Sequence, residues 1–424
     1  MQFLEYPGDL EEINSYLQER NLAFQDELNR KVSGIIEDVQ NEGDKALKKY
    51  TEKFDGVELD DLQVPEEKMQ NVSIDGELER ALIRTRDRLQ DYYRSQLEKS
   101  WIHPHLSGEV GEKKTALKSA GIYIPGGRAA YPSSVFMTAV PASVAGVRRI
   151  AAVTPPGEEG SINPVTARAL QLCGVEEVYR LGGAQAVAAL ALGTDSVPAV
   201  DKIVGPGNRY VTMAKKLVYG LVDIDMLAGP SEVMIIADGS AESSFLAADL
   251  LAQAEHDPEA KCVVVSTSSS LAGELEDGLN EQLQDLKTAE RARKALEEYG
   301  LFVGVDCLEQ AVDLANKFAP EHLELLTECP GELVRDVENA GSIFLGSYSP
   351  EAAGDYMAGP NHVLPTAGTA RFFSPLSVRD FIKSSGRMQL QEEELRELGP
   401  DIMKIARAED LPAHARSIQV RLEG

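Results

Sequence analysis

One short unit recurs along this chain and constrains its fold more than any other feature: an apolar run, then a Gly, Pro or Ser turn, then an Ala- and Leu-rich segment of helical pattern. The runs with their turns are GIYIPGG, VYRLGGAQ, KIVGPGN, VMIIADGS, CVVVSTSS and SIFLGSYS. Continuous apolar strands that alternate with helices are typical of parallel sheets, because each crossover is a helix and central strands are buried on both faces. The chain is therefore predicted to be an α/β protein.

The turns after these apolar runs are where chemistry is expected, because ligands of parallel sheets bind outside the carboxyl ends of the strands. Before the repeated units, charged helical patterns over 29–50 and 75–100 predict helices on an outer face. After them, the Gly- and Pro-rich stretch 354–375 gives way to charged helices. This change in texture favours a domain boundary near residue 375.

Length and charge limit the number of domains and the kinds of partner. The chain has 424 residues, and at roughly 150 residues per domain this predicts two or three domains. It has 42 Lys and Arg against 69 Asp and Glu, a formal charge of −27 that repels phosphate backbones and anionic bilayers. We therefore expect neither nucleic acid nor a membrane as a partner. The hydrophobic share of 43% is ordinary, so the acidity indicates a solvated surface and not disorder.

The sequence contains no recognisable targeting or membrane segment. The N-terminal sequence MQFLEYPGDLEEI lacks a basic segment followed by an apolar core, which argues against a secretory signal. The longest apolar stretches, such as 135–147, contain Thr, Pro and Ser and are too short to cross a bilayer. The four cysteines have no CxxC spacing and are too sparse for a disulfide framework, so we expect reduced thiols. These cysteines are Cys173, Cys262, Cys307 and Cys329. Together these features predict a cytoplasmic protein.

Four of the six histidines lie in contexts that favour a chemical role, since neutral imidazole is a common metal ligand and a common proton carrier near pH 7. These four are His256, His322, His362 and His414. His103 and His105, in the Pro-containing segment WIHPHL, are predicted to be surface or structural residues. Gln253 and His256 are three residues apart, so on a helix they share a face and can converge on a cation. The alternative is a helix C-terminus where His256 meets the macrodipole.

Two further pairs of residues point to metal or proton chemistry. Asp355 and His362 flank a Gly- and Pro-rich loop, and a carboxylate with neutral imidazole is a normal ligand pair for a zinc-type ion. Alone this pair is a weak signal, because the alternative is that Asp355 is an exposed helix residue. Glu321 and His322 follow Pro320, and they are either the opening of a helix or a pair of general bases. Two His, one carboxylate and one amide oxygen would form an open metal site with room for substrate.

Three Gly-rich turns indicate a binding site, although the GxGxxG fingerprint of dinucleotide binding is absent. The turns are YIPGG at 123–127, GGAQ at 182–185 and GPGN at 205–208. Glycine allows a ligand to approach the backbone closely, and Tyr123, Gln185 and Asn208 supply polar side chains. Each turn alone is unremarkable, whereas three together indicate an extended ligand.

Nine motifs, in this order, resemble the histidinol dehydrogenase family over nearly the whole chain. They are GIYIPGGRAAYPSSV, LGGAQAVAAL, GPGNRYV, IDMLAGPSEVMIIAD, AQAEHDP, APEHLELL, GSIFLG, GDYMAGPNHVLPT and EDLPAHARS. The resemblance implies two incomplete Rossmann-like domains with parallel sheets, an N-terminal helical arm and a small C-terminal domain. The expected division is an arm at 1–20, a first Rossmann-like domain with the metal and the bases at 21–122 and 231–375, a second for NAD at 123–230, and a C-terminal domain at 376–424.

The same resemblance implies an activity and a set of functional residues. The activity is NAD-dependent oxidation of L-histidinol through L-histidinaldehyde to L-histidine, the last steps of histidine biosynthesis, with two NAD and one water. One Zn²⁺ per subunit is implied, with the ligands Gln253, His256, Asp355 and His414. His322 is implied as the base that removes the alcohol proton, and Glu321 as the base that activates water. The implied substrate contacts are Ser231, Gln253, His256, His322, Asp355, His362, Glu409 and His414, and the implied NAD contacts are Tyr123, Gln185 and Asn208.

The resemblance also implies a homodimer in which the C-terminal tail, with Glu409 and His414, completes the active site of the partner. The tail departs from the family at Asp410, where many members have Gly. NAD is an anion, so we expect Arg128, Arg209 and the Gly-rich backbone amides to offset the acidic field where it binds. Two other functions remain open: a dehydrogenase of another polyol in the same family, such as a sulfonated propanediol, and a metal-dependent hydrolase.

Overall fold

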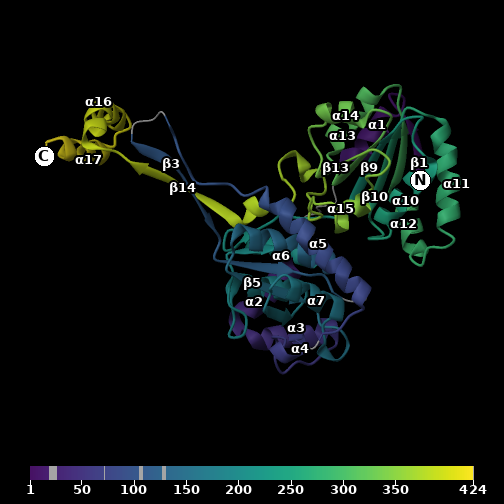
Figure 1. Ribbon diagram of the computed structural model, residues 1–424, viewed down its shortest axis with the longest axis horizontal. Coiled ribbons are helices and arrows are strands. Elements are labelled where there is room, and N and C mark those ends of the chain that lie inside the picture. Colours follow the sequence, from purple (N-terminus) through teal and green to yellow (C-terminus); the bar gives the residue numbers. More distant parts are fainter. Residues whose placement is uncertain (19–25, 71, 105–107, 127–129, 424) are drawn as a thin grey trace. The chain divides into compact units, whose positions relative to one another are not determined.

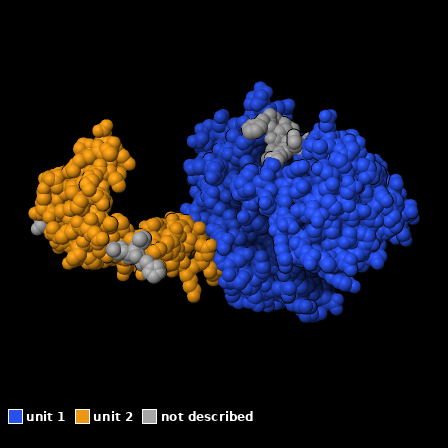
Figure 2. Space-filling view, turned by 90° about the horizontal axis from the view of Figure 1, so that it is seen from above, with its two compact units in different colours: residues 1–96, 117–381 blue, residues 97–116, 382–424 orange. Residues whose placement is uncertain are grey.

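The computed structural model describes residues 1–18, 26–70, 72–104, 108–126 and 130–423. The chain divides into two compact units (Figure 2): unit 1 comprises Met1–Gln96 and Leu117–Phe381, and unit 2 comprises Leu97–Ala116 and Ile382–Gly424. Unit 1 contains two parallel sheets, named sheet A and sheet B below, and unit 2 contains a small antiparallel sheet with two helices. None of the helices in the described residues is both long enough and apolar enough to cross a membrane.

Sheet A has six parallel strands in the order β1-β11-β10-β9-β12-β13 (Figure 1). They are β1 Gln2–Glu5, β11 Gly300–Gly304, β10 Lys261–Ser266, β9 Glu232–Ala237, β12 His322–Leu326 and β13 Ser342–Leu345. One face is covered by α10 (Ser243–Ala254), α11 (Ser270–Gln282) and α12 (Ala289–Tyr299), and the other by α1 (Leu10–Gln18) and α13 (Leu308–Phe318). Val233 of β9 packs in the first core and its neighbour Met234 in the second. Both faces are covered, so the central strands β9 and β10 are buried throughout.

Sheet B has five parallel strands in the order β6-β5-β4-β7-β8. They are β6 Glu177–Arg180, β5 Arg149–Thr154, β4 Ser119–Tyr123, β7 Lys202–Val204 and β8 Asp223–Ile224. One core joins this sheet to α2 (Asp26–Glu42), α3 (Asp44–Asp55), α8 (Gly183–Leu192) and α9 (Arg209–Val218). On the other face, α6 (Pro132–Ala145) lies against β4 and β5, with α5 (Gly76–Arg94) and α7 (Pro164–Leu172) packed beside it (Figure 1).

The remaining elements of unit 1 are short. They are the helices α4 Glu66–Gln70, α14 Pro330–Leu333 and α15 Glu351–Tyr356, and the 3-10 turns η1 Glu158–Gly160, η2 Val334–Asp336, η3 Thr369–Arg371 and η4 Val378–Phe381. Of these, α15 carries two acidic side chains, Glu351 and Asp355, four residues apart on one face.

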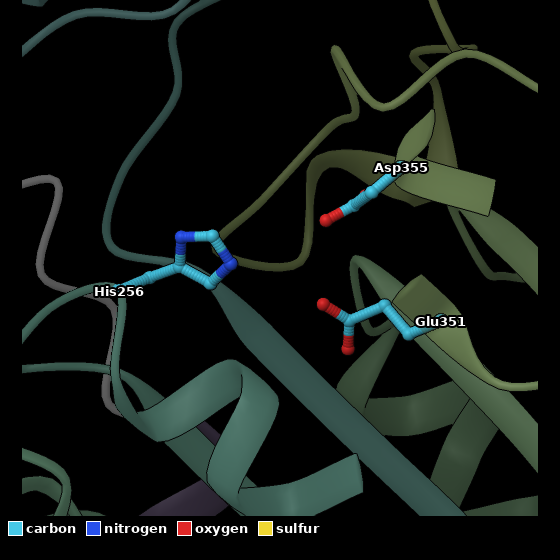
Figure 3. A group of neighbouring side chains, drawn as sticks. All are labelled: His256, Glu351 and Asp355. Carbon is cyan, nitrogen blue, oxygen red and sulfur yellow. The ribbon is translucent and has the colours of Figure 1, made fainter. Parts of the chain in front are cut away.

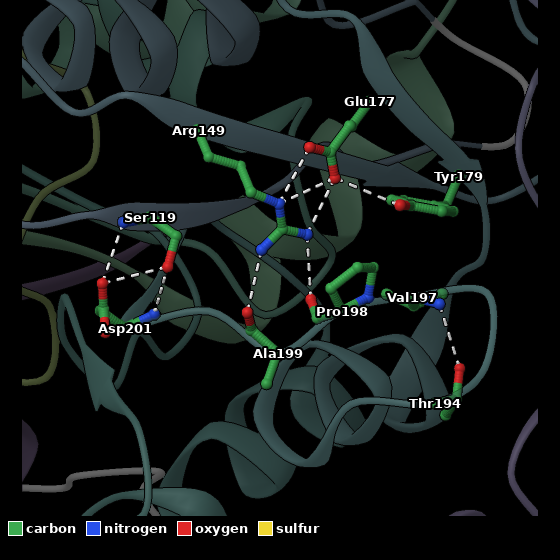
Figure 4. A network of polar contacts seen from close by, with 9 residues as sticks. All are labelled: Ser119, Arg149, Glu177, Tyr179, Thr194, Val197, Pro198, Ala199 and Asp201. Atoms are coloured by element: carbon green, nitrogen blue, oxygen red, sulfur yellow. Dashed lines mark hydrogen bonds and ion pairs between the residues drawn. The ribbon is translucent and has the colours of Figure 1, made fainter.

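The amino ends of the strands in sheet B are tied together by polar side chains (Figure 4). Arg149, at the start of β5, donates from Nε and Nη2 to the Glu177 carboxylate at 2.9 and 2.8 Å, and from Nη1 to the Ala199 carbonyl at 2.9 Å. The Asp201 carboxylate accepts from the backbone N and the Oγ of Ser119 at 2.9 and 3.1 Å. This edge of the sheet is thus closed by its own hydrogen bonds.

Unit 2 is built from two segments that are distant in the sequence. Its antiparallel sheet has the order β14-β3-β2, with β14 Ile382–Gln389, β3 Glu109–Ala116 and β2 Trp101–Ile102. Two helices follow, α16 Glu392–Ala408 and α17 Pro412–Glu423. Gln391 and Glu394 form a capping box at the start of α16, which satisfies backbone donors of its first turn. The two helices pack closely at Gly399, where a Cβ would lie only 2.7 Å from the Leu422 side chain.

The parallel α/β architecture predicted from the recurring unit is confirmed. Each of the six apolar runs with its turn contains a strand of sheet A or sheet B. The single helical pattern over 29–50 is divided into α2 and α3 at Gly43, where φ is 55°. Glycine adopts a positive φ at little steric cost, which explains why the helical pattern continues while the helix does not.

The N-terminal segments do not follow the expected division of domains. The described part of 1–20 is not a separate arm: β1 is an edge strand of sheet A, and α1 buries Ile13 and Leu17 in the core of that sheet. Helices α2 and α3, expected to belong with sheet A, pack instead in the core of sheet B, where Val32 and Leu47 are fully buried. An amphipathic pattern identifies a buried face but not the sheet that buries it.

The C-terminal unit also differs from the expected one. It begins at 382 rather than 376, and it includes 97–116, which was expected in the first Rossmann-like domain. The reason is strand pairing: β14 pairs antiparallel with β3 along its whole length, from Ile382 opposite Ala116 to Gln389 opposite Glu109. A hydrogen-bonded ladder between distant segments leaves no mark in the local pattern of either segment.

Candidate active site

A cluster of acidic and imidazole side chains lies at the amino ends of two neighbouring strands of sheet A. His322 is the first residue of β12, Glu321 precedes it, and Ser231 directly precedes β9, which pairs in parallel with β12. Glu321 and His322 therefore do not open a helix. The expectation that chemistry lies at the carboxyl ends of the strands does not hold for this cluster. Helix α10 runs back from the carboxyl end of β9 and so brings Gln253 and His256 to the amino edge, shortly before β10 begins.

The backbone of Glu232 holds both candidate bases. Its N–H donates to Oε2 of Glu321 at 2.9 Å, and its carbonyl oxygen lies 3.2 Å from Nδ1 of His322. A carbonyl oxygen only accepts, so Nδ1 carries the proton and Nε2 keeps its lone pair. Nε2 is buried and has no hydrogen-bond partner among the described residues. The imidazole is thus oriented as a neutral base with one free acceptor atom.

Burial shifts the proton affinity of both bases. Burial lowers the pKa of His322 to about 4, although the nearby Asp355 carboxylate acts in the opposite direction. Burial also raises the pKa of Glu321 well above its usual range, against hydrogen bonds from the Glu232 backbone and the Ser231 side chain. His322 is therefore neutral at physiological pH, and Glu321 is a stronger base than an exposed carboxylate.

Three side chains converge close to these bases in an arrangement that fits a metal ion (Figure 3). One ligand atom each of His256, Glu351 and Asp355 lies within 4.8 Å of the others. His256 follows the end of α10, whereas Glu351 and Asp355 are four residues apart on α15 and share its face. Zn²⁺ binds imidazole nitrogen and carboxylate oxygen at about 2 Å, so modest side-chain rotation brings these atoms onto one ion.

Two more predicted residues adjoin this group. The carboxamide of Gln253, which is 1% exposed, lies against the Glu351 carboxylate and, with its nitrogen on that side, donates to both oxygens at 2.8 and 2.6 Å. Nδ1 of His362 lies 3.9 Å from Oδ1 of Asp355, and burial lowers the pKa of this imidazole. Seven residues predicted from the sequence therefore lie at this edge of sheet A: Ser231, Gln253, His256, Glu321, His322, Asp355 and His362.

Glu351 belongs to the site although the sequence reasoning did not select it. It is 2% exposed, and its Oε2 lies 3.9 Å from Nδ1 of His322. Burial raises the pKa of Glu351 well above its usual range, with nearby carboxylates, first Asp355, adding to the effect. A signal was present in the sequence, because Glu351 and Asp355 have the i, i+4 spacing that places two side chains on one helical face.

The predicted NAD contacts lie at the carboxyl end of β4 in sheet B. The hydroxyl of Tyr123, the last residue of β4, accepts from the N–H of Gly183 at 3.0 Å. Gln185, in the first turn of α8, is 1% exposed, and its Oε1 has no partner among the described residues. A Cβ on Gly205 would lie 2.2 Å from the carbonyl oxygen of Tyr123, so the 205–208 turn also approaches this point. The described parts of the three Gly-rich turns thus converge.

These turns present polar groups and helix N-termini to a ligand. Oδ1 of Asn208 accepts from the N–H groups of Tyr210 and Val211 at 2.9 and 3.2 Å, which caps α9 and leaves Nδ2 as a donor. The N-termini of α8 and α9 favour an anion. The unpaired Oε1 of Gln185 suits a donor such as a ribose hydroxyl or a carboxamide. Arg209, exposed at the start of α9, adds positive charge.

Known proteins resemble this chain closely. A family model described as histidinol dehydrogenase matches residues 18–422. Over 410 residues, 96% of this chain and 95% of the relative, the chain is 48% identical to a histidinol dehydrogenase from Clostridium acetobutylicum. A relative from Bacillus subtilis with the same name is 47% identical over 94% of each chain. The chain belongs to the histidinol dehydrogenase family. A crystal structure of histidinol dehydrogenase from Elizabethkingia anophelis has a TM-score of 0.95 to this fold at 37% identity, covering 100% of this chain and 98% of the other.

Membership in the histidinol dehydrogenase family makes the chain a dehydrogenase and so an oxidoreductase. The resemblance read from the nine motifs is confirmed. The remaining predicted site residues, Glu409 and His414, belong to unit 2, where they are exposed at the junction of α16 and α17. A contribution of these residues to a partner's site stays a prediction.

Asp410 has an unusual backbone conformation. Its φ is 55°, and the N–H of Leu411 donates to the carbonyl of Ala406 at 2.9 Å, a hydrogen bond that closes the end of α16. This left-handed position favours Gly, and Asp tolerates it better than most other residues. The departure from the family motif therefore leaves the turn of the tail intact.

Several earlier expectations fall on other parts of the chain. His105 and Arg128 lie outside the described residues. His103 follows β2 in unit 2, where its N–H donates to the carbonyl of Val110 at 2.7 Å. All four cysteines are free thiols, as the sequence predicts, and Cys262 is buried.

Proposed function

We propose that this protein oxidises L-histidinol through L-histidinaldehyde to L-histidine, using two NAD, one water and one Zn²⁺ per subunit. His322 carries the proposal: it is a neutral buried imidazole whose Nδ1 is bound by the Glu232 carbonyl and whose Nε2 has no partner among the described residues. Oxidation of an alcohol needs a base at the hydroxyl as hydride leaves, and Nε2 meets that need.

The residues that would hold the cofactors are distributed over two edges. His256 and Asp355 would hold the zinc together with the amide oxygen of Gln253, whose nitrogen is bound by Glu351, and His414 of the partner subunit would be the fourth ligand. The NAD would be held by the side chains of Tyr123, Gln185 and Asn208. When bound, NAD accepts hydride, and Zn²⁺, which is redox-inert, holds the donor atoms of the substrate and fixes their orientation.

In the first half-reaction, His322 accepts the alcohol proton at Nε2. The Glu232 carbonyl fixes the ring and its tautomer, so the free lone pair is held at one position. Burial disfavours the charged imidazolium, which keeps the base unprotonated before the substrate binds. The ring of Phe344, with its centroid 5.9 Å away, adds to the apolar surroundings of this base.

In the second half-reaction, Glu321 accepts a proton from the water that adds to the aldehyde. Its Oε2 is occupied by the Glu232 N–H at 2.9 Å, and this bond sets the direction of the other oxygen. Two bases suit two different protons, one from an alcohol and one from water, because each must lie within hydrogen-bond distance of its own donor.

The carboxyl groups of the cluster favour an amino alcohol over a sulfonated polyol. Glu321, Glu351 and Asp355 place three carboxyl groups around the site, and Glu409 of the partner subunit would add a fourth. Their oxygens accept hydrogen bonds from the N–H groups of an amine or an imidazole, whereas a sulfonate offers only acceptor atoms. We therefore place a sulfonated propanediol second as a substrate. The proposed biosynthetic role also fits a cytoplasmic location.

The proposed function is tested by a steady-state assay with L-histidinol and NAD, before and after chelation and after return of Zn²⁺. We expect NADH formation, seen by its absorbance, that is lost on chelation and restored by zinc. A panel that includes a sulfonated propanediol separates the substrates. No NADH from any alcohol with zinc restored contradicts the proposal and leaves the metal-dependent hydrolase as the alternative.

The division of labour between the bases is tested by Glu321→Gln. This variant should spare oxidation of L-histidinol to the aldehyde far more than oxidation of added L-histidinaldehyde, because only the second needs activated water. Glu328→Gln is the matched control, since Glu328 is an exposed residue beyond the other end of β12. Equal losses in both half-reactions contradict separate roles.

The homodimer with composite sites is tested by mixing two variants that are each expected to form little L-histidine, and L-histidine formation is the activity measured. His414→Ala and Glu321→Gln subunits, once exchanged, should regain part of the activity, because one site of each mixed dimer then has both residues intact. Subunit exchange is verified by native mass spectrometry of differently tagged chains. No regain with exchange verified contradicts a shared site.

A further inference from the structure

A buried ion pair lies beneath the 205–208 turn in sheet B. Lys215 on α9 and Asp225, which follows β8, form an ion pair with side chains only 4% and 0% exposed. Two charges removed from water in this way are costly to bury, and further hydrogen bonds must satisfy their remaining donors and acceptors. The partners of this pair therefore indicate what it does.

Those partners are the two backbone groups of a single residue, Gly205. Oδ2 of Asp225 accepts from the Gly205 N–H at 2.7 Å, and Nζ of Lys215 donates to the Gly205 carbonyl at 3.1 Å. Oδ1 of Asp225 also accepts from the N–H of Met226 at 2.7 Å, which fixes the carboxylate. The ion pair thus holds Gly205 from both sides of its α-carbon.

Gly205 needs such support because of its conformation. Its φ is 116°, outside the regions that L residues favour, and the backbone comes so close to β4 that a Cβ would lie 2.2 Å from the Tyr123 carbonyl oxygen. Three residues later, Asn208 caps α9 through its Oδ1. The ion pair fixes one end of the turn and the cap fixes the other, and Lys215 belongs to the helix that Asn208 caps.

We propose that Lys215 and Asp225 are positioning residues for NAD binding: they touch no ligand, and they hold the 205–208 turn so that Nδ2 of Asn208 and the start of α9 meet the dinucleotide. This inference rests on the proposed function, because it takes the ligand of the turn to be NAD. Loss of the pair frees the peptide groups of Gly205 and lets the turn move, while the bases and metal ligands of sheet A keep their places.

A second buried lysine on the same sheet provides a matched control. Lys202 is the first residue of β7, has a side chain 6% exposed, and pairs with Asp223 at 2.8 Å. It lies at the amino end of the strand, whereas Gly205 follows the carboxyl end. Lys202→Met removes a buried cation from sheet B without removing any hydrogen bond to the turn.

The test compares Lys215→Met, Asp225→Asn and the double variant Lys215→Met/Asp225→Asn with Lys202→Met and the wild type. The readouts are the Kd for NADH from its fluorescence, KM for NAD and for L-histidinol, kcat, and bound zinc, all well below each variant's Tm. We expect Kd for NADH and KM for NAD to rise about ten- to a hundredfold in the three turn variants. In the same three variants, KM for L-histidinol and the zinc content should not change. Lys202→Met should lower Tm and leave Kd for NADH and KM for NAD unchanged.

Each outcome bears on the positioning role. If the turn variants bind NADH as the wild type does, or if Lys202→Met weakens binding equally, the role is overturned. If Lys215→Met does not fold, the double variant, which leaves no buried charge without a partner, decides in its place. A wild type that binds no NADH contradicts the proposed function itself, whereas a wild type that binds it no better than the variants contradicts only the positioning role.

Discussion

The two sheets of unit 1 carry their candidate functional residues at opposite ends of their strands. In sheet A, Glu321 and His322 lie at the amino end of β12, near metal-binding side chains from α10 and α15. In sheet B, Gly-rich turns at the carboxyl ends of β4, β6 and β7 converge, and the amino edge is closed by pairs such as Arg149 with Glu177. Helices begin at the carboxyl ends of parallel strands, so only that edge offers helix N-termini to an anion.

The two edges also use the backbone in opposite ways. In sheet A, one backbone residue, Glu232, holds two reactive side chains, Glu321 and His322. In sheet B, two side chains, Lys215 and Asp225, hold one backbone residue, Gly205. Proton transfer needs side chains with fixed direction, whereas dinucleotide binding needs backbone with fixed shape. Substitutions in sheet A should therefore lower kcat, and substitutions in sheet B should raise KM for NAD.

The largest effect is expected from His322→Gln. It removes the base while keeping a side chain that can donate to the Glu232 carbonyl, so kcat should fall by about 10²- to 10⁴-fold with KM for NAD little changed. The measurement is steady-state kinetics with both substrates varied. Thr327→Val, just beyond the other end of β12, is the control, because its buried Oγ1 has no partner among the described residues. If His322→Gln instead raises KM for NAD and leaves kcat unchanged, the proposed difference between the two sheets is contradicted.

The metal site should give the next largest effect. His256→Ala removes the only imidazole of the group with Glu351 and Asp355, so bound zinc and kcat should fall together, the latter by about a hundredfold. Zinc is measured by elemental analysis of the dialysed protein. His103→Ala in unit 2 is the control for loss of a histidine elsewhere. Full zinc content in the His256 variant would mean that the carboxylates and Gln253 suffice without it.

A glycine pair tests the sheet B edge. Gly205→Ala should raise KM for NAD about tenfold, because its Cβ would collide with the Tyr123 carbonyl and displace the turn. Gly220→Ala introduces similar backbone strain, since φ is 99° there, but its Cβ would meet nothing within 4 Å. Both variants should lose stability, measured by thermal unfolding, and only the first should lose NAD affinity. Equal KM values for NAD in the two variants would mean that the position of the 205–208 turn does not determine NAD binding.

Some of the strands that the sequence predicts are fully buried, but burial alone does not decide which strands are predicted: β13 was predicted and is half exposed, whereas β11 is fully buried and was not among the predicted runs. The apolar runs of β9 and β10 are buried on both faces, and such runs are visible in one sequence. Strand β12, HLELL, was not among the predicted runs, because His322 and the fully buried Glu324 interrupt its apolar pattern. The buried polar side chains that give β12 its chemistry also interrupt its apolar pattern, and this makes the strand hard to predict from periodicity.

The site residues and their grouping around one metal were predicted by residue type and family resemblance, whereas the edge of the sheet where they meet was not. The local sequence does not predict that α10 brings Gln253 and His256 back to the starts of β9 and β12. That placement follows from the crossover between β9 and β10 and not from the pattern of the helix or of the strands. Glu351 was missed, although its spacing from Asp355 places both on one face. The ion pair beneath Gly205 was also invisible, since Lys215 and Asp225 meet only through the packing of α9 beside β8.

The smallest expected effect comes from two carboxyl groups at opposite ends of α3, next to sheet B. Asp55 ends the helix, its Oδ2 is buried without a partner among the described residues, and burial raises its pKa to about 6. Asp44 begins the helix; burial acts to raise its pKa, but hydrogen bonds from Ser196 and Thr194, together with the charge of Lys48, outweigh burial and lower it. The folded state therefore binds the Asp55 proton more tightly than the unfolded state, and the Asp44 proton less tightly.

The raised pKa of Asp55 and the lowered pKa of Asp44 predict stability changes of opposite sign when each residue is replaced. Stability associated with Asp55 is present below pH 4 and is lost as pH rises to about 6, so Asp55→Asn should stabilise the protein at pH 8 by about 1 kcal/mol, after a discount for its partial exposure. At pH 4.5 the gain should shrink. Asp44→Asn should destabilise at pH 8 instead, because it removes an acceptor. Urea unfolding at both pH values measures these differences. If both variants lose stability at pH 8, the prediction is wrong, and the Asp55 carboxylate must have a partner that offsets the cost of its burial. Asp55 would then be a further charged group, besides Lys215 and Asp225, that stabilises the backbone next to sheet B.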